Sequence, residues 1–302
     1  MDGVLNLRKP AGPTSHGVVD EVRRILAIRR VGHAGTLDPM ATGVLVVCVG
    51  RATRIAEYLM GLPKEYRARV VLGRSTDTED ASGQVIEERG ADGVTREDFE
   101  RACAMFVGEI EQAAPVFSAL KQGGVPMYKL ARRGKPVERK VRRVAVHSIE
   151  VESFTPGTLA EANIVVNCGS GTYIRSLCAD IGRQIGCGAH MGALERTRVG
   201  GFLLEDSVTL QELADSVERG RLHACTIRCT DALSAIPAAL VDEFGARSLG
   251  HGQPVRARVD APISTVVRIV GPGGELVGIG EVLVLDGEPG VKPRKVLVDV
   301  QD

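Results

Sequence analysis

The sequence contains no long hydrophobic run. The longest uninterrupted one, Val44–Val49, is far shorter than the roughly 20 apolar residues that cross a bilayer. The N-terminal Met1-Asp2-Gly3 and the residues after it also lack the apolar stretch of a signal peptide. We therefore expect neither a membrane protein nor a secreted one.

Paired cysteines are absent as well. The seven cysteines are scattered along the chain, and no two of them form a Cys-x-x-Cys pair. An odd and scattered set disfavours a disulfide framework and is typical of buried thiols in a reducing compartment. The sequence therefore predicts a cytoplasmic protein.

A net charge is also absent, because 38 lysine and arginine residues balance 38 aspartate and glutamate residues. The zero sum alone would argue against a nucleic-acid partner, but the charges are unevenly distributed. Residues 121–143 carry nine basic side chains opposed only by Glu138. Such a stretch indicates a polyanion-binding segment, with a solvated loop as the alternative. The nine residues are Lys121, Lys129, Arg132, Arg133, Lys135, Arg139, Lys140, Arg142 and Arg143.

The length and composition indicate a globular protein of two domains. The chain has 302 residues, of which 44% are apolar and 25% charged. Apolar spacing predicts four helices. Their segments are a helix capped by Thr14 or Ser15, Ala52–Met60, a helix with a Thr95–Asp98 capping box, and Thr172–Ile185. Strands are predicted at Val4–Leu7, Gly43–Gly50, Tyr66–Leu72, Val144–Val151 and Ile164–Cys168.

The character of the sequence changes after about residue 236, where helical spacing disappears. Short β-branched runs at Val266–Val270, Val282–Leu285 and Val296–Val300 alternate with glycine and proline turns. We therefore predict an α+β chain whose mainly antiparallel mixed sheet is flanked by helices. The expected domains are residues 1–236 and a small β domain at 237–302.

The most unusual loop is Gly32–Gly43, Gly-His-Ala-Gly-Thr-Leu-Asp-Pro-Met-Ala-Thr-Gly. Its glycines and proline indicate special backbone angles. The loop presents the carboxylate of Asp38 just before a predicted buried strand, where it could act as a nucleophile or a base. The alternative is a simple turn in which Asp38 binds its own backbone.

A second motif, Cys168–Ser176, joins a predicted strand to a predicted helix. Its glycine-rich turn suits an anion, but it is neither a Walker loop nor a Gly-x-Gly-x-x-Gly fingerprint. Tyr173 and Arg175 are expected to point away from the core face of the helix. Arg175 either pairs with a distant carboxylate and keeps it ionised, or is merely solvated.

Three other stretches have simpler interpretations. Tyr66 opens a strand and is either a base-stacking ring or ordinary core. The segment 77–83 lacks the glycine and glutamate of a calcium loop, so we interpret it as an acidic turn. Cys187 and His190 have no second ligand pair, so we expect no metal site.

These stretches belong to a longer series of motifs. The series contains Lys9-Pro10-x-Gly12-x-Thr14-Ser15, the Gly32–Gly43 loop, Lys64-x-Tyr66, Thr76-Asp77-Thr78-x-Asp80, Ser118-Ala119-x-Lys121, Tyr128-x-x-Ala131-Arg132-x-Gly134, Gly171-Thr172-Tyr173-Ile174-Arg175-Ser176-Leu177 and Leu194-x-Arg196-Thr197. Together they closely resemble the TruB family, the bacterial tRNA pseudouridine-55 synthases. The resemblance implies the pseudouridine synthase fold, and the C-terminal β domain looks like the PUA-type domain that this family often carries.

The resemblance implies an isomerisation without cofactor, metal or ATP. Uridine in the tRNA T-loop is flipped out, its N1–C1′ bond is broken, and C5 is joined to C1′. Asp38 would be the catalytic carboxylate, acting either on C1′ or on the 2′ proton. The implied substrate-binding residues are Tyr66 (stacking on the base), Arg175 (pairing with Asp38), Tyr173 and Leu194 (lining the base pocket) and His33 (filling the gap or contacting RNA).

The resemblance also implies how RNA is held. Residues of about 120–145 match the RNA-binding insertion of the family, and tRNA is the expected partner of a monomer that needs no protein partner. Ser170 and Glu195 replace basic residues that are common in the family, which weakens local RNA contact. A non-catalytic RNA-binding or RNA-folding protein and a guide-RNA-directed subunit are the alternatives. The expected RNA-backbone contacts are Lys64, Lys121, Lys129, Arg132 and Arg133.

Overall fold

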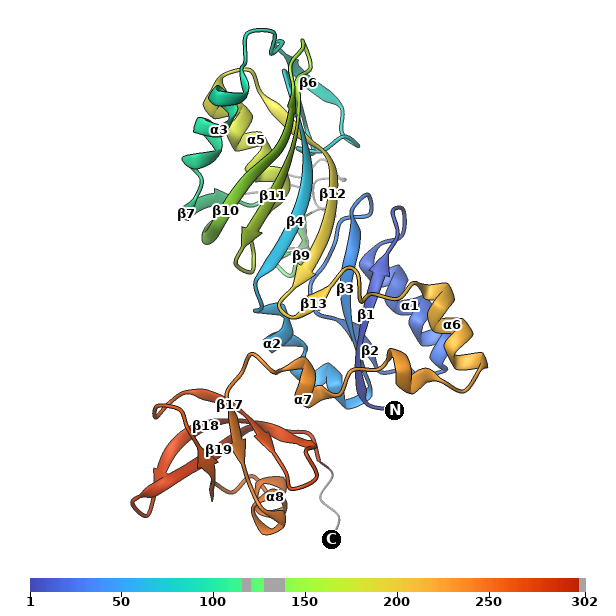
Figure 1. The fold of residues 1–302 in the computed structure, drawn as a ribbon, viewed down its shortest axis with the longest axis vertical. Helices are drawn as coiled ribbons and strands as arrows, with labels where there is room; N and C mark the ends of the chain where they lie inside the picture. The colour runs from blue at the N-terminus through green and yellow to red at the C-terminus, as the bar shows by residue number, and fades with distance from the viewer. Residues whose placement is uncertain (116–120, 128–138, 299–302) are drawn as a thin grey trace.

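The computed structural model describes residues 1–115, 121–127 and 139–298. The molecule is long, with one large sheet along its upper two thirds and a small β module at the C-terminal end (Figure 1). No helix among the described residues is long and apolar enough to cross a membrane.

The large sheet has nine strands within the described ranges, in the order β1-β3-β12-β4-β11-β10-β7, with β2 beside β3 and β13 beside β12. Its pairings in this part of the chain are antiparallel, apart from the parallel pair of β12 and β3. The predicted mixed, mainly antiparallel sheet is therefore confirmed. The strands are β1 (Gly3–Lys9), β2 (Val31–His33), β3 (Thr42–Val49), β4 (Lys64–Leu72), β7 (Gly108–Ala113), β10 (Val141–Thr155), β11 (Glu161–Cys168), β12 (Ala189–Val199) and β13 (Phe202–Leu203).

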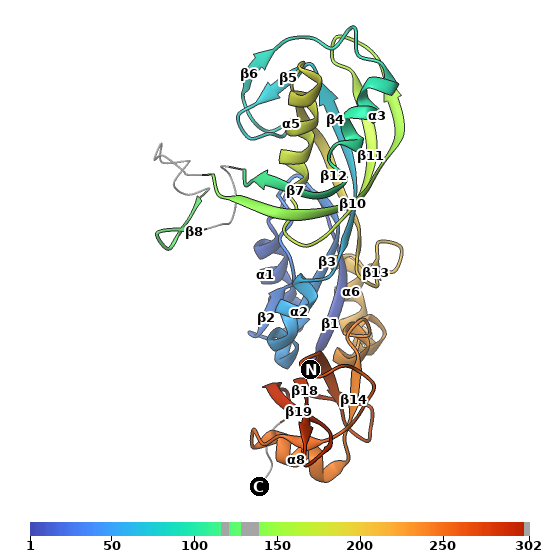
Figure 2. The ribbon, with the colours of Figure 1, turned by 90° about the vertical axis from the view of Figure 1, so that its left-hand side faces the viewer.

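Two small hairpins form two-stranded sheets of their own. In Figure 2, β8 extends sideways from the body, beyond the ends of β7 and β10. The first hairpin pairs β5 (Arg74–Thr76) with β6 (Val85–Glu88), and the second pairs β8 (Lys121–Gln122) with β9 (Val125–Pro126).

Helices cover the sheet in two places. Two of them, α3 and α5, pack on the strands of the upper part, where Phe99 and Ile174 join one apolar core (Figure 1). Two others, α1 and α6, pack together against β1 and β3 around a second core with Val18 and Val22. The helical segments before residue 236 are α1 (Ser15–Leu26), the 3₁₀ turn η1 (Gly50–Ile55), α2 (Ala56–Met60), α3 (Arg96–Ala104), α5 (Ile174–Ile185), α6 (Leu210–Glu218), the 3₁₀ turn η2 (Leu222–Cys225) and α7 (Cys229–Ala232).

The capping signals predicted from sequence are confirmed. Thr14 caps α1 by accepting a hydrogen bond from the Gly17 amide, and Thr95 and Asp98 form a reciprocal capping box at α3. Gly186 ends α5 in the left-handed conformation, with φ of 95°. The segment predicted as one helix, Ala52–Met60, is instead a 3₁₀ turn followed by the short α2.

The C-terminal module is a barrel-like sheet of six strands within the described residues, in the order β15-β19-β18-β17-β14-β16. The expectation that helical structure disappears there was wrong, because Asp242 caps α8 (Glu243–Gly250). Of the predicted strand at Val296–Val300, residues 297–298 are not in a strand, since β19 ends at Val296, and residues 299–300 lie outside the described residues. The strands are β14 (Ala238–Leu240), β15 (Val255–Arg256), β16 (Arg258–Val259), β17 (Val266–Val270), β18 (Leu276–Leu285) and β19 (Glu288–Val296).

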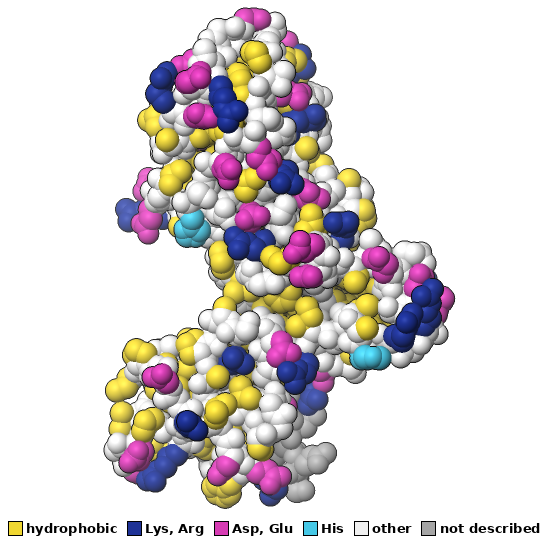
Figure 3. All heavy atoms as spheres, viewed as in Figure 1, with side chains coloured by type: hydrophobic (Ala, Val, Ile, Leu, Met, Phe, Trp, Pro, Cys, Tyr) yellow, Lys and Arg dark blue, Asp and Glu magenta, His cyan; other side chains and the backbone are white. Residues whose placement is uncertain are grey.

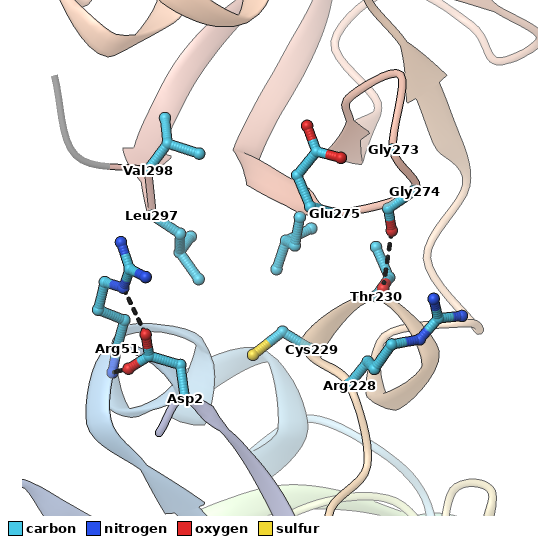
Figure 4. Close-up of a pocket in the computed structure, with 11 residues that line it drawn as sticks. Asp2, Arg51, Arg228, Cys229, Thr230, Gly273, Gly274, Glu275, Leu297 and Val298 are labelled. Carbon is cyan, nitrogen blue, oxygen red and sulfur yellow. Dashed lines mark hydrogen bonds and ion pairs between the residues drawn. The ribbon is translucent and has the colours of Figure 1, made fainter. Parts of the chain in front are cut away.

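The module packs on the lower end of the large sheet. Leu276, Ile279 and Leu297 share a core cluster with Val4 and Val46 of β1 and β3. A cavity of about 360 Å³ lies at this junction, between the Asp2–Arg51 ion pair and the hydrogen bond from Thr230 to Gly274 (Figure 4). Its lining residues do not include the motifs singled out above.

Candidate active site

Asp38 lies on the loop between β2 and β3, and both of its carboxylate oxygens face Arg175. Nε of Arg175 is 2.9 Å from Oδ2, and Nη2 donates to Oδ1 at 3.3 Å. The side chain of Asp38 is 33% exposed, whereas that of Arg175 is 6% exposed. The carboxylate is therefore bound by a buried guanidinium and is still partly exposed, so that a ligand can reach it.

The expectation that Arg175 points away from the core was wrong. Its side chain is buried at the first turn of α5, where Nη1 reaches Oδ2 of Asp80 at 3.4 Å and donates to the Thr78 carbonyl at 3.1 Å. Asp80 in turn accepts hydrogen bonds at Oδ1 from Thr78 and Ser82. One guanidinium thus joins two carboxylates that are far apart in sequence.

These charges act on Asp38 in opposite directions. Burial raises the pKa of the Asp38 carboxyl, Arg175 lowers it again in part, and the Asp80 carboxylate raises it. The balance leaves the pKa of Asp38 above its ordinary value. A carboxylate with a raised pKa is a better base than an ordinary aspartate, and the guanidinium favours its charged form.

The Asp38 loop is fixed by side chains from β1 and α1. The buried Lys9 ammonium donates to the carbonyls of Pro39 at 3.1 Å and Ala41 at 2.7 Å. Burial lowers the pKa of Lys9 to about 8, although nearby Asp38 raises it in part. Ser15 completes the attachment, because its hydroxyl both donates to and accepts from the Leu37 backbone.

An apolar wall lies next to the carboxylate. Tyr66 and Leu194, on the adjacent strands β4 and β12, are each 8% exposed and share a core cluster with Leu37 and Ile174, the sequence neighbours of Asp38 and Arg175. Burial raises the pKa of the Tyr66 hydroxyl, and nearby Arg196 partly offsets that effect. The structure therefore brings Tyr66 and Leu194 together with Asp38 and Arg175.

Tyr173 and His33 are near this group in sequence, two residues before Arg175 and five residues before Asp38 respectively. Tyr173 precedes α5, and the buried side chain of Gln112 on β7 makes two hydrogen bonds to its backbone. Gln112 Nε2 donates to the Tyr173 carbonyl at 2.9 Å, and Gln112 Oε1 accepts from the Tyr173 amide at 2.7 Å. His33 ends β2, before the Asp38 loop, and burial lowers the pKa of its imidazole. Gln112 carries no motif signal that would have shown this role.

The structure tests only part of the expected set of RNA-backbone contacts. Lys64 is buried, its ammonium donates to the carbonyls of Met60 and Leu62, and burial lowers its pKa to about 8. A buried ammonium that is bonded to backbone carbonyls cannot reach an RNA phosphate. The expectation that Lys64 contacts the RNA backbone was therefore wrong, and its role here is structural. Lys121 begins β8, and Lys129, Arg132 and Arg133 lie outside the described residues.

Residues 139–143, at the C-terminal end of the basic stretch, lie within the described structure, and some of their basic side chains form ion pairs with glutamates. Arg139 binds Glu79 at 2.6 Å and also donates to the carbonyls of Ala113 and Ala114, while Arg142 is exposed. On the face in Figure 3, basic and acidic side chains are interspersed over the upper part, without a field of one sign.

Within the described parts of the chain, no group of three or more His, Cys, Asp or Glu side chains could hold a metal ion. In the 77–83 turn, the Asp80 carboxylate pairs with the Arg175 guanidinium and not with a metal ion. Asp80 is a contact of Arg175 that the sequence analysis did not identify. Asp80 belongs to the Thr76–Asp80 motif, which we counted in the family resemblance and otherwise interpreted as an acidic turn, without assigning a role to its carboxylate.

Comparison with known families gives three adjoining matches. Residues 23–174 match the TruB family pseudouridylate synthase N-terminal domain, and residues 175–230 match the tRNA pseudouridylate synthase B C-terminal domain. Residues 237–297 match the C-terminal domain of pseudouridine synthase II TruB.

Similar proteins cover nearly the whole chain. The tRNA pseudouridine synthase B of Heliobacterium modesticaldum is 39% identical over 301 residues, 100% of this chain and 97% of that protein. That of Syntrophotalea carbinolica is 42% identical over 91% of this chain and 90% of its own. A crystal structure of a Cbf5-Nop10-Gar1 complex matches with a TM-score of 0.77 and 30% identity, covering 99% of this chain and 85% of that one. The chain belongs to the TruB family of pseudouridylate synthases.

Proposed function

We propose that this protein converts uridine-55 in the T-loop of tRNA to pseudouridine. The observation that carries the proposal is the two-point contact of buried Arg175 with a partly exposed Asp38, beside the apolar wall of Tyr66 and Leu194. A solvated surface turn would need none of this. The family and the names of its similar members support the same reaction.

The chemistry is an isomerisation within one nucleotide. The N1–C1′ bond breaks and a C5–C1′ bond forms, while C5 loses a proton and N1 gains one. Asp38 either attacks C1′ and is later released, or removes the 2′ proton to give a glycal. Both paths require an ionised carboxylate, which Arg175 supports. The atoms balance without a co-substrate.

The nucleotide must leave the stacked RNA before Asp38 can reach it, which costs a few kcal/mol. Tyr66 stacks on the everted base, and Leu194 and Tyr173 line its pocket. His33, with an imidazole whose pKa burial lowers, fills the gap or contacts RNA as a neutral group. Stacking and exclusion of water offset part of the cost of eversion.

The basic stretch supplies sequence-independent affinity for the RNA backbone. Exposed Arg142 and the expected contacts Lys121, Lys129, Arg132 and Arg133 neutralise phosphates and release counterions. The protein acts in the cytoplasm as a monomer without a protein partner. Its two domains are residues 1–236 and 237–302.

Two substrates test this proposal. Purified protein is incubated with unmodified tRNA and with a bare T-arm stem-loop, and pseudouridine is mapped at nucleotide resolution. Conversion of position 55 in both, in the presence of a metal chelator, is the expected result. Binding without conversion supports an RNA-folding protein instead. Conversion only when a guide RNA or a protein is added supports a guided subunit.

A further inference from the structure

Arg196 is a buried cation that the chemistry above does not use. It lies in the C-terminal half of β12 and is 1% exposed. Within the described residues its guanidinium donates to three backbone carbonyls: Nε to Val44 at 2.7 Å, Nη1 to Thr36 at 3.3 Å and Nη2 to Gly35 at 3.1 Å. A buried charge of this kind is expensive, and a well-packed apolar side chain would often stabilise a core at least as well.

The three carbonyls mark the two ends of the Asp38 loop. Gly35 and Thr36 lie just before Asp38, and Val44 lies just after the loop has entered β3. One planar guanidinium therefore bridges the loop where it starts and where it finishes. Lys9 and Ser15, by contrast, hold the middle of the loop.

The backbone of β12 also lies unusually close to this loop. A Cβ added to Gly43 would be 2.2 Å from the Arg196 carbonyl oxygen, and the φ of Gly43 is +101°. Only glycine fits such an approach in that conformation. The strand that carries Arg196 is thus fixed against the loop by backbone as well as by side chain.

Arg196 also reaches the other side of the proposed base pocket. It is paired in register with Tyr66 across β12 and β4, and its side chain interacts with the Tyr66 hydroxyl. The loop of Asp38 and the ring of Tyr66 come from separate parts of the chain. Arg196 contacts both.

We propose that Arg196 is a positioning residue that sets the Asp38 loop and the Tyr66 ring relative to each other. The inference rests on the proposed isomerisation. A uridine stacked on Tyr66 presents C1′ to Asp38 only if this spacing is held, and an error of about 1 Å in such a geometry can cost about 10²-fold in rate. Arg196 itself touches no reacting atom.

The test uses Arg196→Lys, which keeps the charge but loses the planar fork. Single-turnover conversion and binding of an unmodified T-arm stem-loop are measured for the full chain. We expect the rate to fall about 10- to 100-fold with a nearly unchanged Kd, because positioning acts on the chemical step. Thr197→Val is the matched control on the same strand, since it removes a hydrogen bond to Glu65 and leaves the loop alone.

A second variant keeps the inference testable if Arg196→Lys does not fold, as judged by circular dichroism. Tyr66→Phe preserves the stacking ring and removes the hydroxyl that Arg196 contacts, so it is expected to lower the rate without weakening binding. Where Arg196→Lys does fold, the two losses in the double variant should be less than multiplicative. Unchanged rates in folded Arg196→Lys or in Tyr66→Phe overturn the inference, as does a loss confined to Kd. Absence of pseudouridine from the wild-type reaction refutes the proposed function instead.

Discussion

At the scale of single residues, the site depends on one guanidinium shared by two carboxylates. Arg175 holds Asp38 at 2.9 Å and Asp80 at 3.4 Å, and only Asp38 remains partly exposed. Asp80 therefore orients Arg175, while Asp38 is free to meet a ligand. Without Arg175, Asp38 would be an ordinary aspartate in a turn.

The first prediction concerns pH. The folded-state pKa of Asp38 lies above its ordinary value, so activity is lost as pH falls through that raised pKa. Arg175→Met removes the group that lowers this pKa, so the acid limb of the rate profile should move to higher pH. At neutral pH the rate should also fall about 10²- to 10³-fold. Single-turnover rates across pH test this, and an unshifted acid limb would contradict it.

The second prediction concerns Lys64. Lys64→Met leaves the Met60 and Leu62 carbonyls without this donor, so it should lower the free energy of unfolding by about 1–3 kcal/mol. It should not change the salt dependence of RNA binding. Exposed Arg142 is the control, because Arg142→Ala should reduce the salt slope by about one and leave stability unchanged. A flatter salt slope in Lys64→Met would restore Lys64 as a phosphate contact.

At the scale of elements, two helix starts could be predicted from their caps, whereas the interior strand β12 could not. Thr14 and Thr95 identify the starts of α1 and α3 by their hydroxyls. The strand β12 was missed because Arg196 is buried where alternation would place an apolar residue. The helix α6 was overlooked although Thr209 and Glu212 form a capping box.

Some residues of the candidate site could be singled out from the sequence, but the contacts between them could not. Asp38 stood out because its loop combines glycines, a proline and a carboxylate, and Arg175 because it follows a glycine-rich turn. Their pairing was one of two alternatives, because nothing local to either segment fixes a distance across the sheet. Gln112, whose role depends entirely on facing Tyr173, gave no signal at all.

The third prediction tests that contact between β7 and α5. Gln112→Leu removes both hydrogen bonds to the Tyr173 backbone and should destabilise the fold by about 1–3 kcal/mol. Because Tyr173 lines the proposed base pocket, turnover should fall as well. Gln211→Leu, at an exposed glutamine of α6, is the control for stability. Thermal unfolding that is the same in both variants would remove Gln112 from this role.

At the scale of the whole molecule, the C-terminal module is joined to the large sheet by a common core. Leu276 and Leu297 pack with Val46, and across the junction Arg54 donates to the Val296 carbonyl at 2.6 Å while Lys295 pairs with Glu57. We expect a buried apolar junction of this kind to couple the unfolding of the two parts. The module is therefore more than a tethered RNA-binding attachment.

The fourth prediction follows from this junction. A chain that ends at residue 236 exposes the apolar side chains around Val4 and Val46, so its midpoint of thermal unfolding should be lower than that of the full chain. The full chain should unfold in a single transition. Differential scanning calorimetry tests both points, and two separate transitions, or equal midpoints, would show that the parts are independent.

The most direct test of the catalytic role is the fate of Asp38→Asn. This variant keeps the size and shape of the side chain but removes the charge that Arg175 faces. Single-turnover conversion of an unmodified T-arm stem-loop should fall to background, while the stem-loop still binds with nearly the wild-type Kd. Turnover by Asp38→Asn at the wild-type rate would contradict the assignment of this carboxylate.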